Sequence, residues 1–353
     1  MDEIVASLIA RIKSARAGKT PLAIHGGRTK AFYGGEINGE PLDVRSYAGI
    51  IEYEPKELVL TVRAGTTLAE IESTMDKSAQ ILPFEPPHYA PGATIGGTVA
   101  SGLSGPRRPY TGAVRDFVLG ARILSGVGDD LRFGGRVIKN VAGYDVSRLM
   151  VGAMGTLGVL LDLSFKVLPK PAEDITLRYE MDEAAAIRQF NEWAGKPLPI
   201  SATSWHENVA MLRLSGAAAG VKAARQKLGG ELVSEDGARN FWSKLRDQRD
   251  VFFQSAEPLW RISVPPTATP LGLAMPQWIE WGGGLRWHRG PAEGAMLRPK
   301  VAAAGGHATL FRNGNKSVGV FHQLQPALEK IHRNLKLAFD PENILNRGRM
   351  DNF

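Results

Sequence analysis

Hydrophobic and polar positions alternate along this chain in short blocks that predict a mixed α+β protein. Ile4, Leu8 and Ile12 recur with helical spacing, which predicts an amphipathic helix near the N-terminus. Thr67 and Glu70 have the spacing of a capping box, so a helix is expected to begin there. Short apolar runs bounded by turn-forming residues predict strands at 21–25, 42–47, 49–55 and 57–65.

A hairpin and a longer strand are predicted before the pattern of strands and helices changes near residue 171. Two strand-like runs flank Gly126–Asp130, a pattern that indicates a β-hairpin. From 159 to 167 an apolar residue occupies every second position, which predicts a half-buried strand. Pro169 and Pro171 then interrupt the pattern, and we place a domain boundary near residue 171.

The second half of the chain predicts one antiparallel sheet built from two ferredoxin-like halves. Strands and helices follow each other in the order β-α-β-β-α-β from residue 174 to 233, and a looser version of this order continues to 312. A helix is predicted over 327–339. We therefore expect one domain at 1–171, a second at 172–330, and a C-terminal helix and tail at 331–353 that return to the first.

Composition narrows the classes of function. The chain has 353 residues, of which 43% are hydrophobic and 22% charged, as in an ordinary globular protein. No apolar run is long enough to span a membrane, and the N-terminus is unlike a signal peptide, so we expect a cytoplasmic protein. The chain has no cysteine, which excludes disulfides, cysteine zinc sites and thiolate-held iron–sulfur clusters. Electron transfer by this chain would therefore need an organic cofactor.

Charge and glycine together point to an anionic ligand. The net charge of +7 favours a phosphate-bearing cofactor, a carboxylate, nucleic acid or an anionic membrane as partner. Glycine clusters let main-chain amides converge on pyrophosphate, although a single glycine-rich loop is more often a simple turn. Three such clusters adjoin strand-like runs, and two lie near cations. They are Gly26 with Gly27, Gly96 and Gly97 with Gly102, and Gly155 with Gly158.

Five segments, in this order, carry a resemblance to a known superfamily. They are residues 24–30, 91–102, 139–149, 152–160 and 339–346. The chain resembles the FAD-binding oxidases of the vanillyl-alcohol oxidase (PCMH-type) superfamily, and most closely the family of FAD-binding E subunits of bacterial glycolate oxidase (glycolate dehydrogenase). The resemblance is strong over 20–170 and in the tail, and weak over 175–330. It implies a two-lobed, PCMH-type FAD domain followed by an α+β cap domain.

The same resemblance implies which residues contact FAD. The first loop would wrap the pyrophosphate, the second would line the diphosphate and ribityl chain, and the third would approach the adenine side or the ring edge. The implied cofactor-binding residues are His25, Gly26, Gly27, Arg28, Thr29, Lys30, Pro91, Gly92, Thr94, Gly96, Gly97, Thr98, Ser101, Gly102, Arg107, Tyr110, Asp145, Arg148, Gly155, Thr156, Gly158 and Val159.

Two departures from the family pattern matter. Members that bind flavin covalently carry histidine directly after the first glycine pair, where this chain has Arg28, so we expect non-covalent FAD. Related catalytic subunits carry an H-x-G-x-G-N-x-H metal motif. The nearest segment here is GGHATLFRNGN with His307, and no metal site is predicted.

Oxidation of a small 2-hydroxy acid needs cations for the carboxylate and a base for the hydroxyl proton. Arg286, His288 and His307 are the catalytic candidates. On a strand, Arg286 and His288 would share one face, with Trp287 and Arg289 opposite. The alternative is a solvated edge strand with one packed tryptophan.

Three functions are compared. The first is an FAD subunit that oxidises glycolate to glyoxylate and passes electrons to two partners, a paralogous FAD-binding subunit and an iron–sulfur subunit. Peripheral attachment to the inner face of the cytoplasmic membrane through this complex is an open alternative. The second is a flavin-binding structural or electron-relay subunit without turnover of its own. The third is an RNA- or anion-binding protein, since a β-α-β-β-α-β sheet can stack bases. That third hypothesis leaves the glycine loops unexplained, so no nucleic-acid partner is predicted.

Overall fold

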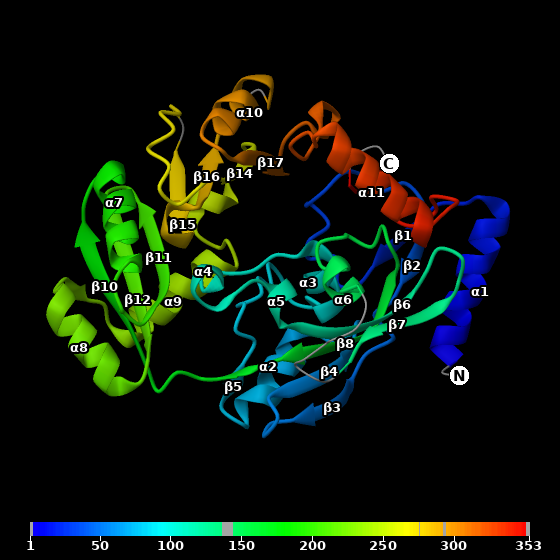
Figure 1. Ribbon diagram of the computed structural model, residues 1–353, viewed down its shortest axis with the longest axis horizontal. Helices are drawn as coiled ribbons and strands as arrows, with labels where there is room; N and C mark the ends of the chain where they lie inside the picture. The colour runs from blue at the N-terminus through cyan, green and yellow to red at the C-terminus, as the bar shows by residue number, and fades with distance from the viewer. Residues whose placement is uncertain (1–2, 136–143, 275, 292–293, 351–353) are drawn as a thin grey trace.

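Two regions and a returning C-terminal segment make up the molecule (Figure 1). The computed structural model describes residues 3–135, 144–274, 276–291 and 294–350. Residues 139–143, part of one motif that carries the family resemblance, lie outside the described residues. We call residues 3–169 the N-terminal region and residues 173–312 the cap region. The domain boundary at residue 171 falls between them and remains our proposal.

The N-terminal region begins with a small lobe. Its elements are α1 (Glu3–Gly18) and the parallel strand pair β1 (Leu22–His25) and β2 (Glu40–Asp43). The predicted N-terminal helix is confirmed. Its Val5, Leu8 and Ile12 are buried against Leu22 and Leu42, so the apolar stripe of the helix covers the strand pair.

The second lobe of this region is a five-stranded antiparallel sheet in the order β3-β4-β8-β6-β7. Its strands are β3 (Ile50–Glu54), β4 (Val59–Arg63), β6 (Val118–Leu124), β7 (Asp130–Gly134) and β8 (Val159–Lys166). A short pair, β5 (Gln80–Ile81) and β9 (Leu168–Pro169), lies beside it. The predicted hairpin around Gly126–Asp130 is confirmed as β6 and β7. The prediction that 159–167 is half-buried is wrong, because six of the eight β8 residues are buried between β4 and β6.

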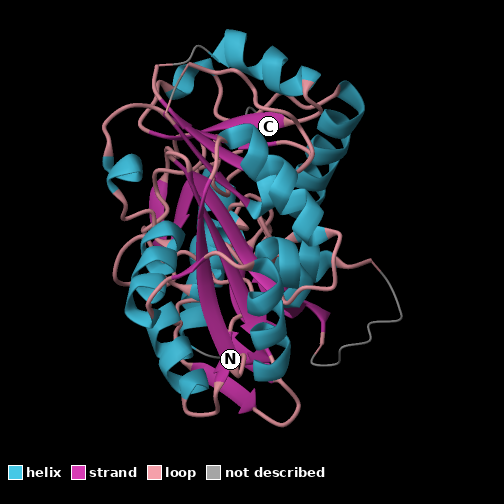
Figure 2. Ribbon diagram, turned by 90° about the vertical axis from the view of Figure 1, so that its left-hand side faces the viewer, coloured by secondary structure: helices cyan, strands magenta, loops and turns pink. Residues whose placement is uncertain are grey.

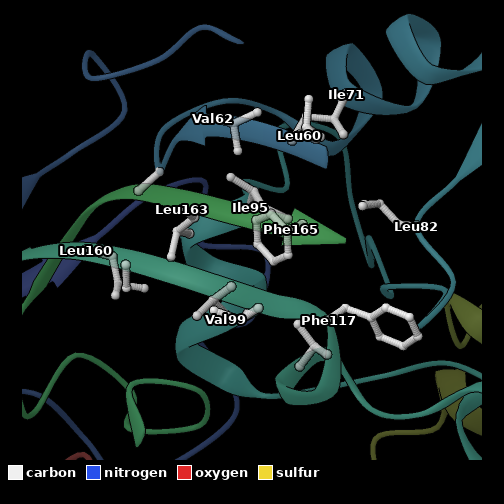
Figure 3. Close-up of a cluster of buried hydrophobic side chains, with 14 of the residues drawn as sticks. Leu60, Val62, Ile71, Leu82, Ile95, Val99, Phe117, Leu160, Leu163 and Phe165 are labelled. Carbon is white, nitrogen blue, oxygen red and sulfur yellow. The ribbon is translucent and has the colours of Figure 1, made fainter. Parts of the chain in front are cut away.

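Short helices cover one face of this sheet. They are α2 (Leu68–Asp76), α3 (Ile95–Ser101), α5 (Val114–Phe117) and α6 (Val146–Leu149). A further short helix, α4 (Arg108–Thr111), contacts the cap region instead. Figure 3 shows Ile95 and Val99 of α3 beside Leu163 and Phe165 of β8 in the buried core. The predicted cap of α2 is confirmed, since the Thr67 hydroxyl accepts a hydrogen bond from the Glu70 amide.

The cap region is one eight-stranded antiparallel sheet in the order β13-β10-β12-β11-β15-β16-β14-β17. In chain order its elements are β10 (Glu173–Glu180), α7 (Glu183–Ala194), β11 (Ile200–His206), β12 (Val209–Gly216), α8 (Ala218–Leu228), β13 (Glu231–Leu232), α9 (Glu235–Arg246), β14 (Leu259–Ser263), β15 (Gln277–Glu280), β16 (Leu285–Arg289), α10 (Gly294–Ala303) and β17 (His307–Arg312). The 3-10 helices are η1 (Val251–Gln254), η2 (Trp281–Gly283) and η3 (Lys316–Val318). The predicted β-α-β-β-α-β order is confirmed from β10 to β13. The second half differs, because within the described residues no helix joins β14 to β15.

The two faces of the cap sheet meet different neighbours. Helices α7, α8 and α10 pack on one face, around side chains such as Phe190 and Ile262. The opposite face carries Trp278 and Trp287, which pack in an aromatic cluster with Tyr33 of the N-terminal region. In Figure 2, with the cap side toward the viewer, the strands run through the middle with helices along their flanks. The second face therefore forms the junction between the two regions.

The C-terminal segment returns to the N-terminal region. After α11 (Pro326–Phe339), Leu345 forms a parallel bridge with Leu22 of β1. The Asp340 carboxylate is fully buried and accepts hydrogen bonds from Lys336 Nζ and the Leu345 amide. None of the described helices has both the length and the hydropathy that crossing a bilayer requires.

Candidate functional site

A cleft of about 560 Å³ lies between the two lobes of the N-terminal region. The loop after β1 forms one wall, α3 and the start of β8 form the other, and the C-terminal tail closes one end. Twelve of the residues that the sequence predicted as cofactor-binding line this cleft. They are His25, Gly26, Gly27, Arg28, Thr29, Lys30, Thr94, Gly96, Gly97, Ser101, Gly155 and Gly158.

Close backbone contacts explain why the cleft walls need glycine. A Cβ on Gly27 would lie 1.8 Å from the carbonyl oxygen of Gly92, so the first and second loops touch through their main chains. A Cβ on Gly26 would lie 2.6 Å from Thr94 Oγ1. Gly155 has φ +75°, and a Cβ there would lie 2.6 Å from Asn346 Nδ2. The three glycine clusters therefore converge on one space.

The first loop presents unpaired main-chain donors. Within the part of the chain that the structure describes, the amides of residues 26–30 donate to no protein acceptor. Amides without a protein partner need water or a ligand as acceptor. A run of five such donors matches the many oxygens of a pyrophosphate group.

The cleft is also cationic. Among the described lining residues, Arg28, Lys30, Lys316 and Arg349 face a single acidic side chain, Glu36. Lys30 is 8% exposed, and burial lowers its pKa to about 8 although Asp247 opposes the shift. Among the described residues, the ammonium group of Lys30 has one hydrogen bond, a long one to Thr29 Oγ1 at 3.4 Å. An anion next to Lys30 would stabilise the charged form of this lysine.

His25 and Arg28 form a pair at the mouth of the cleft. The His25 Nδ1–H donates to the Ala23 carbonyl at 3.1 Å, which leaves Nε2 to accept from Arg28 Nη2 at 2.9 Å. Arg28 is exposed and has φ +54°, a backbone conformation that residues other than glycine rarely adopt. Its guanidinium is thus held over the loop whose amides are unpaired.

The sequence analysis missed the contribution of the tail to this cleft. Asn346 is buried, its Oδ1 accepts from the Ile24 amide at 2.7 Å, and its Nδ2 donates to the Met154 carbonyl at 2.7 Å. Arg349 donates to the carbonyls of Lys30 and Gly35. The tail motif was recognised as a whole, but the individual polar residues in it carried no signal of their own.

Asn346 is expected to hold the two walls of the cleft together. Replacing it by alanine leaves the Ile24 amide and the Met154 carbonyl without partners. Each such group, when buried, costs about 1–3 kcal/mol of the free energy of unfolding. We therefore expect Asn346→Ala to lower both the free energy of unfolding and the affinity for the cleft ligand, measured by urea unfolding and by ligand titration. Asn334→Ala, an exposed change inside α11, serves as control: ligand affinity is expected to stay unchanged, and the free energy of unfolding is expected not to fall, since alanine favours the helix.

Other predicted cofactor residues lie near the cleft without lining it. Pro91 and Gly92 are exposed in the second loop, Thr98 is buried in α3 and Gly102 caps it with φ +65°. Val159 is fully buried in β8.

Three further predicted cofactor residues do not line the cleft: Asp145, Arg148 and Thr156. Arg148 and Thr156 line a second cavity of about 330 Å³, and Asp145 caps α6 and pairs with Arg148.

Arg107 and Tyr110 lie at the junction with the cap region. The Arg107 guanidinium pairs with Glu85 and Asp174, and its amide donates to Glu85 at 2.9 Å. Tyr110 packs against the cap core, and its hydroxyl donates to Thr203 Oγ1 at 3.5 Å. The structure therefore brings neither side chain to the cleft.

The catalytic candidates Arg286 and His288 share one face of β16, as expected, with Trp287 on the other. Strand β16 lies between β15 and β14, so the alternative of a solvated edge strand is wrong. Their face is the one that the helices cover. Arg286 is fully buried and donates to the carbonyls of Gly283, Thr269 and Ala268. His288 is also buried, and burial together with the charge of Arg286 lowers its pKa to about 3. The structure does not bring these two residues to the cleft.

His307, the third catalytic candidate, has a different position. It pairs with Ser263 in the register of β14 and β17, which places it on the same face as Arg261. Part of its surface is exposed, and partial desolvation together with Arg261 and His322 lowers its pKa. This residue faces the junction between the regions, although it does not line the cleft.

Comparison with known proteins identifies the family. Residues 3–134 match the family model described as FAD binding domain. The chain is 48% identical over 344 residues to glycolate oxidase subunit GlcE of Escherichia coli (strain K12), covering 98% of this chain and 96% of that protein. The chain belongs to the GlcE family of glycolate oxidase subunits. The resemblance to glycolate oxidase E subunits, the α+β fold and the FAD-binding domain predicted from the sequence are confirmed.

More distant relatives of this GlcE-family chain share only parts of it. Glycolate oxidase subunit GlcD of Bacillus subtilis (strain 168) is 34% identical over 154 residues, which cover 43% of this chain and 33% of that protein. Among solved structures, p-cresol methylhydroxylase superposes with a TM-score of 0.72 at 15% identity, over 98% of this chain and 87% of that one. Alkyldihydroxyacetonephosphate synthase superposes with a TM-score of 0.68 at 14% identity, over 96% and 74%. These two structures support the fold.

The cleft of this GlcE-family chain fits FAD. The glycines let the loops pack closely around one space, the amides of residues 26–30 have no protein acceptor among the described residues, and four cations balance phosphate charge. When bound, FAD supplies a two-electron acceptor, a chemistry that protein side chains lack.

Proposed function

We propose that this protein is the FAD-binding subunit of a glycolate oxidase complex and that it takes part in oxidising glycolate, a 2-hydroxy acid, to glyoxylate. The main support is the cleft: unpaired amides and cations converge there, in a chain that is 48% identical to a GlcE subunit over nearly its whole length. The name of that relative supplies the substrate and the complex.

The side chains of the cleft have distinct proposed roles. The amides of residues 26–30 hold the pyrophosphate, and Arg28 and Lys30 neutralise its charge. Thr94 caps α3 by accepting from the Gly97 amide, which fixes the second loop at the start of this helix. Asn346 ties β1 to the Met154–Gly155 turn. Since Arg28 stands where covalent members of the superfamily carry histidine, FAD is proposed to be dissociable.

We further propose that electrons leave the flavin for partner chains, namely a paralogous FAD-binding subunit and an iron–sulfur subunit. The 353 residues contain no cysteine, so the thiolates of any cluster must come from another polypeptide. Any attachment to the cytoplasmic membrane is proposed to run through those partners.

Purification of the full chain and of the complex tests this function. The expected result is a yellow protein whose flavin passes into the supernatant on acid precipitation and has the mass of FAD. Glycolate added without oxygen is expected to bleach the flavin absorbance of the complex. Flavin that stays with the precipitate would contradict non-covalent binding, and a complex that glycolate does not bleach would contradict the substrate.

The same experiment separates the two roles that the sequence left open. Bleaching of the isolated full chain by glycolate indicates that this subunit turns over substrate itself. Bleaching only in the complex, with bound FAD in both samples, indicates an electron-relay role for this subunit.

A further inference from the structure

Two arginines from different regions meet at one tryptophan at the junction. Arg108 comes from α4 of the N-terminal region and lies 4.4 Å from the centroid of the Trp281 ring. Arg261 comes from β14 of the cap and lies 5.3 Å from the same centroid. Helix α4 contacts both β11 and η2, the element that carries Trp281, so the docking of the regions brings these charges together.

These two guanidinium groups differ from that of Arg107 in forming no direct ion pair. Among the described residues, neither the Arg108 nor the Arg261 side chain has an ion-pair or hydrogen-bond partner, and Asp116 is the acidic residue that acts on Arg108 electrostatically. Arg107, the residue before Arg108, pairs with Glu85 and Asp174. Partial burial and the neighbouring charge of Arg261 lower the pKa of Arg108, although Asp116 opposes this shift, so the two like charges disfavour each other. An anion between them would relieve this repulsion.

The Trp281 ring, which both arginines contact, belongs to a residue with an uncommon backbone conformation. Trp281 has φ +56°, which is rare for a bulky residue and occurs most often where function requires it. Its indole Nε1–H donates to the Gly105 carbonyl of the N-terminal region at 3.1 Å, and the next amide, Gly282, donates to Thr203 Oγ1 at 2.8 Å. The ring is therefore fixed with respect to both regions.

The arginine pair is open to small molecules and close to the FAD cleft. Arg108 is exposed and Arg261 is half-buried, so solvent reaches both residues. Tyr33 lines the cleft, and burial raises its pKa while Arg261 opposes the shift, which places the guanidinium within electrostatic reach of the cleft wall. The aromatic cluster that contains Tyr33 and Trp281 connects the two sites.

A buried carboxyl group adjoins Arg261. Glu280 is 5% exposed, its Oε1 accepts from Trp287 Nε1 at 2.7 Å, and burial raises its pKa to about 7 although Arg261 lowers it. It forms no ion pair with either arginine among the described residues. Glu280 therefore acts on Arg261 only through space and forms no direct contact that would block an anion.

We propose that Arg108 and Arg261 bind the carboxylate of a small 2-hydroxy acid beside Trp281, next to the FAD cleft. This inference rests on the proposed function, because glycolate oxidation requires a carboxylate site. Two charge-assisted contacts from opposite sides position a carboxylate more precisely than one. A site assembled from both regions would exist only when the cap is docked.

The test uses the full chain loaded with FAD and the purified complex. Arg108→Gln and Arg261→Gln remove one cation each, and the matching lysine variants keep the charge. Oxalate, which has no C–H bond to oxidise, probes binding by calorimetry in the full chain, and glycolate gives KM and kcat in the complex. Arg239→Gln, an exposed change on α9, is the control.

We expect each glutamine variant to raise the Kd for oxalate and the KM for glycolate about 10- to 100-fold, the effect of losing one charge-assisted hydrogen bond. The lysine variants should recover part of the loss, and FAD content should stay at the wild-type level. Unchanged Kd and KM in both glutamine variants, with normal FAD content, would overturn the site.

The two proposals fail in different ways. A wild-type complex that binds FAD but does not oxidise glycolate overturns the proposed function. If its oxalate binding still depends on Arg108 and Arg261, the carboxylate site stands for another acid. Glycolate oxidation that is insensitive to both arginines leaves the proposed function intact and overturns this inference.

Discussion

Replacing Gly27 by alanine is expected to release FAD from a protein that otherwise stays folded. The φ of Gly27 is not positive, so alanine can adopt its backbone conformation. The added Cβ, however, would lie 1.8 Å from the Gly92 carbonyl oxygen, which cannot move aside as a flexible side chain would. The first loop must then shift away from the second, and its amides lose their common target. We expect the Kd for FAD to rise by at least about 100-fold, or ~2.7 kcal/mol.

Fluorescence titration of the apoprotein with FAD measures this effect, and circular dichroism checks the fold of each variant. Gly220→Ala is the matched control, because a Cβ there meets nothing within 4 Å and Gly220 lies inside α8. That change should leave FAD affinity unaltered and raise the free energy of unfolding by about 0.5–1 kcal/mol, since alanine is the better helix former. Equal FAD affinity in Gly27→Ala and wild type would show that the contact between the loops does not shape the site.

The sequence predicted the cleft better than it predicted the substrate side. Gly26, Gly27 and Gly97 were found because a local pattern, small residues beside a strand and a cation, has a local cause. Asn346 could not be found in this way. Its importance comes from hydrogen bonds to Ile24 and Met154, which are distant in the chain, and no spacing in the sequence reports such contacts.

Arg286 and His288 illustrate a second limit. Alternation along β16 predicted correctly that they share one face, but it does not say which face helices will cover. The order of the strands and the positions of α7 and α10 decide that the face of Arg286 is closed and the face of Arg261 looks toward the N-terminal region. The strand pattern alone therefore selected Arg286, whose face of the sheet is covered by helices and does not contact the cleft.

Arg107 and Arg108 show the same limit at single-residue scale. In the sequence the two are adjacent and equivalent. In the structure Arg107 is 8% exposed and paired with Glu85, whereas Arg108 is exposed beside Trp281. The partner that separates them, Glu85, carried no sequence signal, because a buried carboxylate is recognised only from what surrounds it.

Glu85 is expected to be among the most sensitive positions for stability. Its carboxylate accepts from the Arg107 amide, the Arg107 guanidinium and Arg213 Nη2 of β12 in the cap, so it joins the two regions. Removing one partner from a buried ion pair costs about 3–5 kcal/mol, because the remaining charges stay buried without compensation. We therefore expect Glu85→Ala to lower the free energy of unfolding by about this amount, measured by urea unfolding at neutral pH. Glu231→Ala removes an exposed partner of Arg178, and is expected to change stability by less than about 1 kcal/mol.

The pH dependence gives Glu85 a second test. Burial raises the pKa of Glu85, but Arg213 and Arg107 outweigh burial and hold the pKa below its usual value of 4.5. A carboxylate whose pKa is lower in the folded state contributes stability above the unfolded-state pKa, and this contribution is lost as the pH falls through the folded-state pKa. The wild type should therefore lose stability more steeply than Glu85→Gln when the pH drops below 4.5, with the two curves parallel at higher pH. Parallel acid unfolding curves over the whole range would show that Arg213 and Arg107 do not act through this carboxylate.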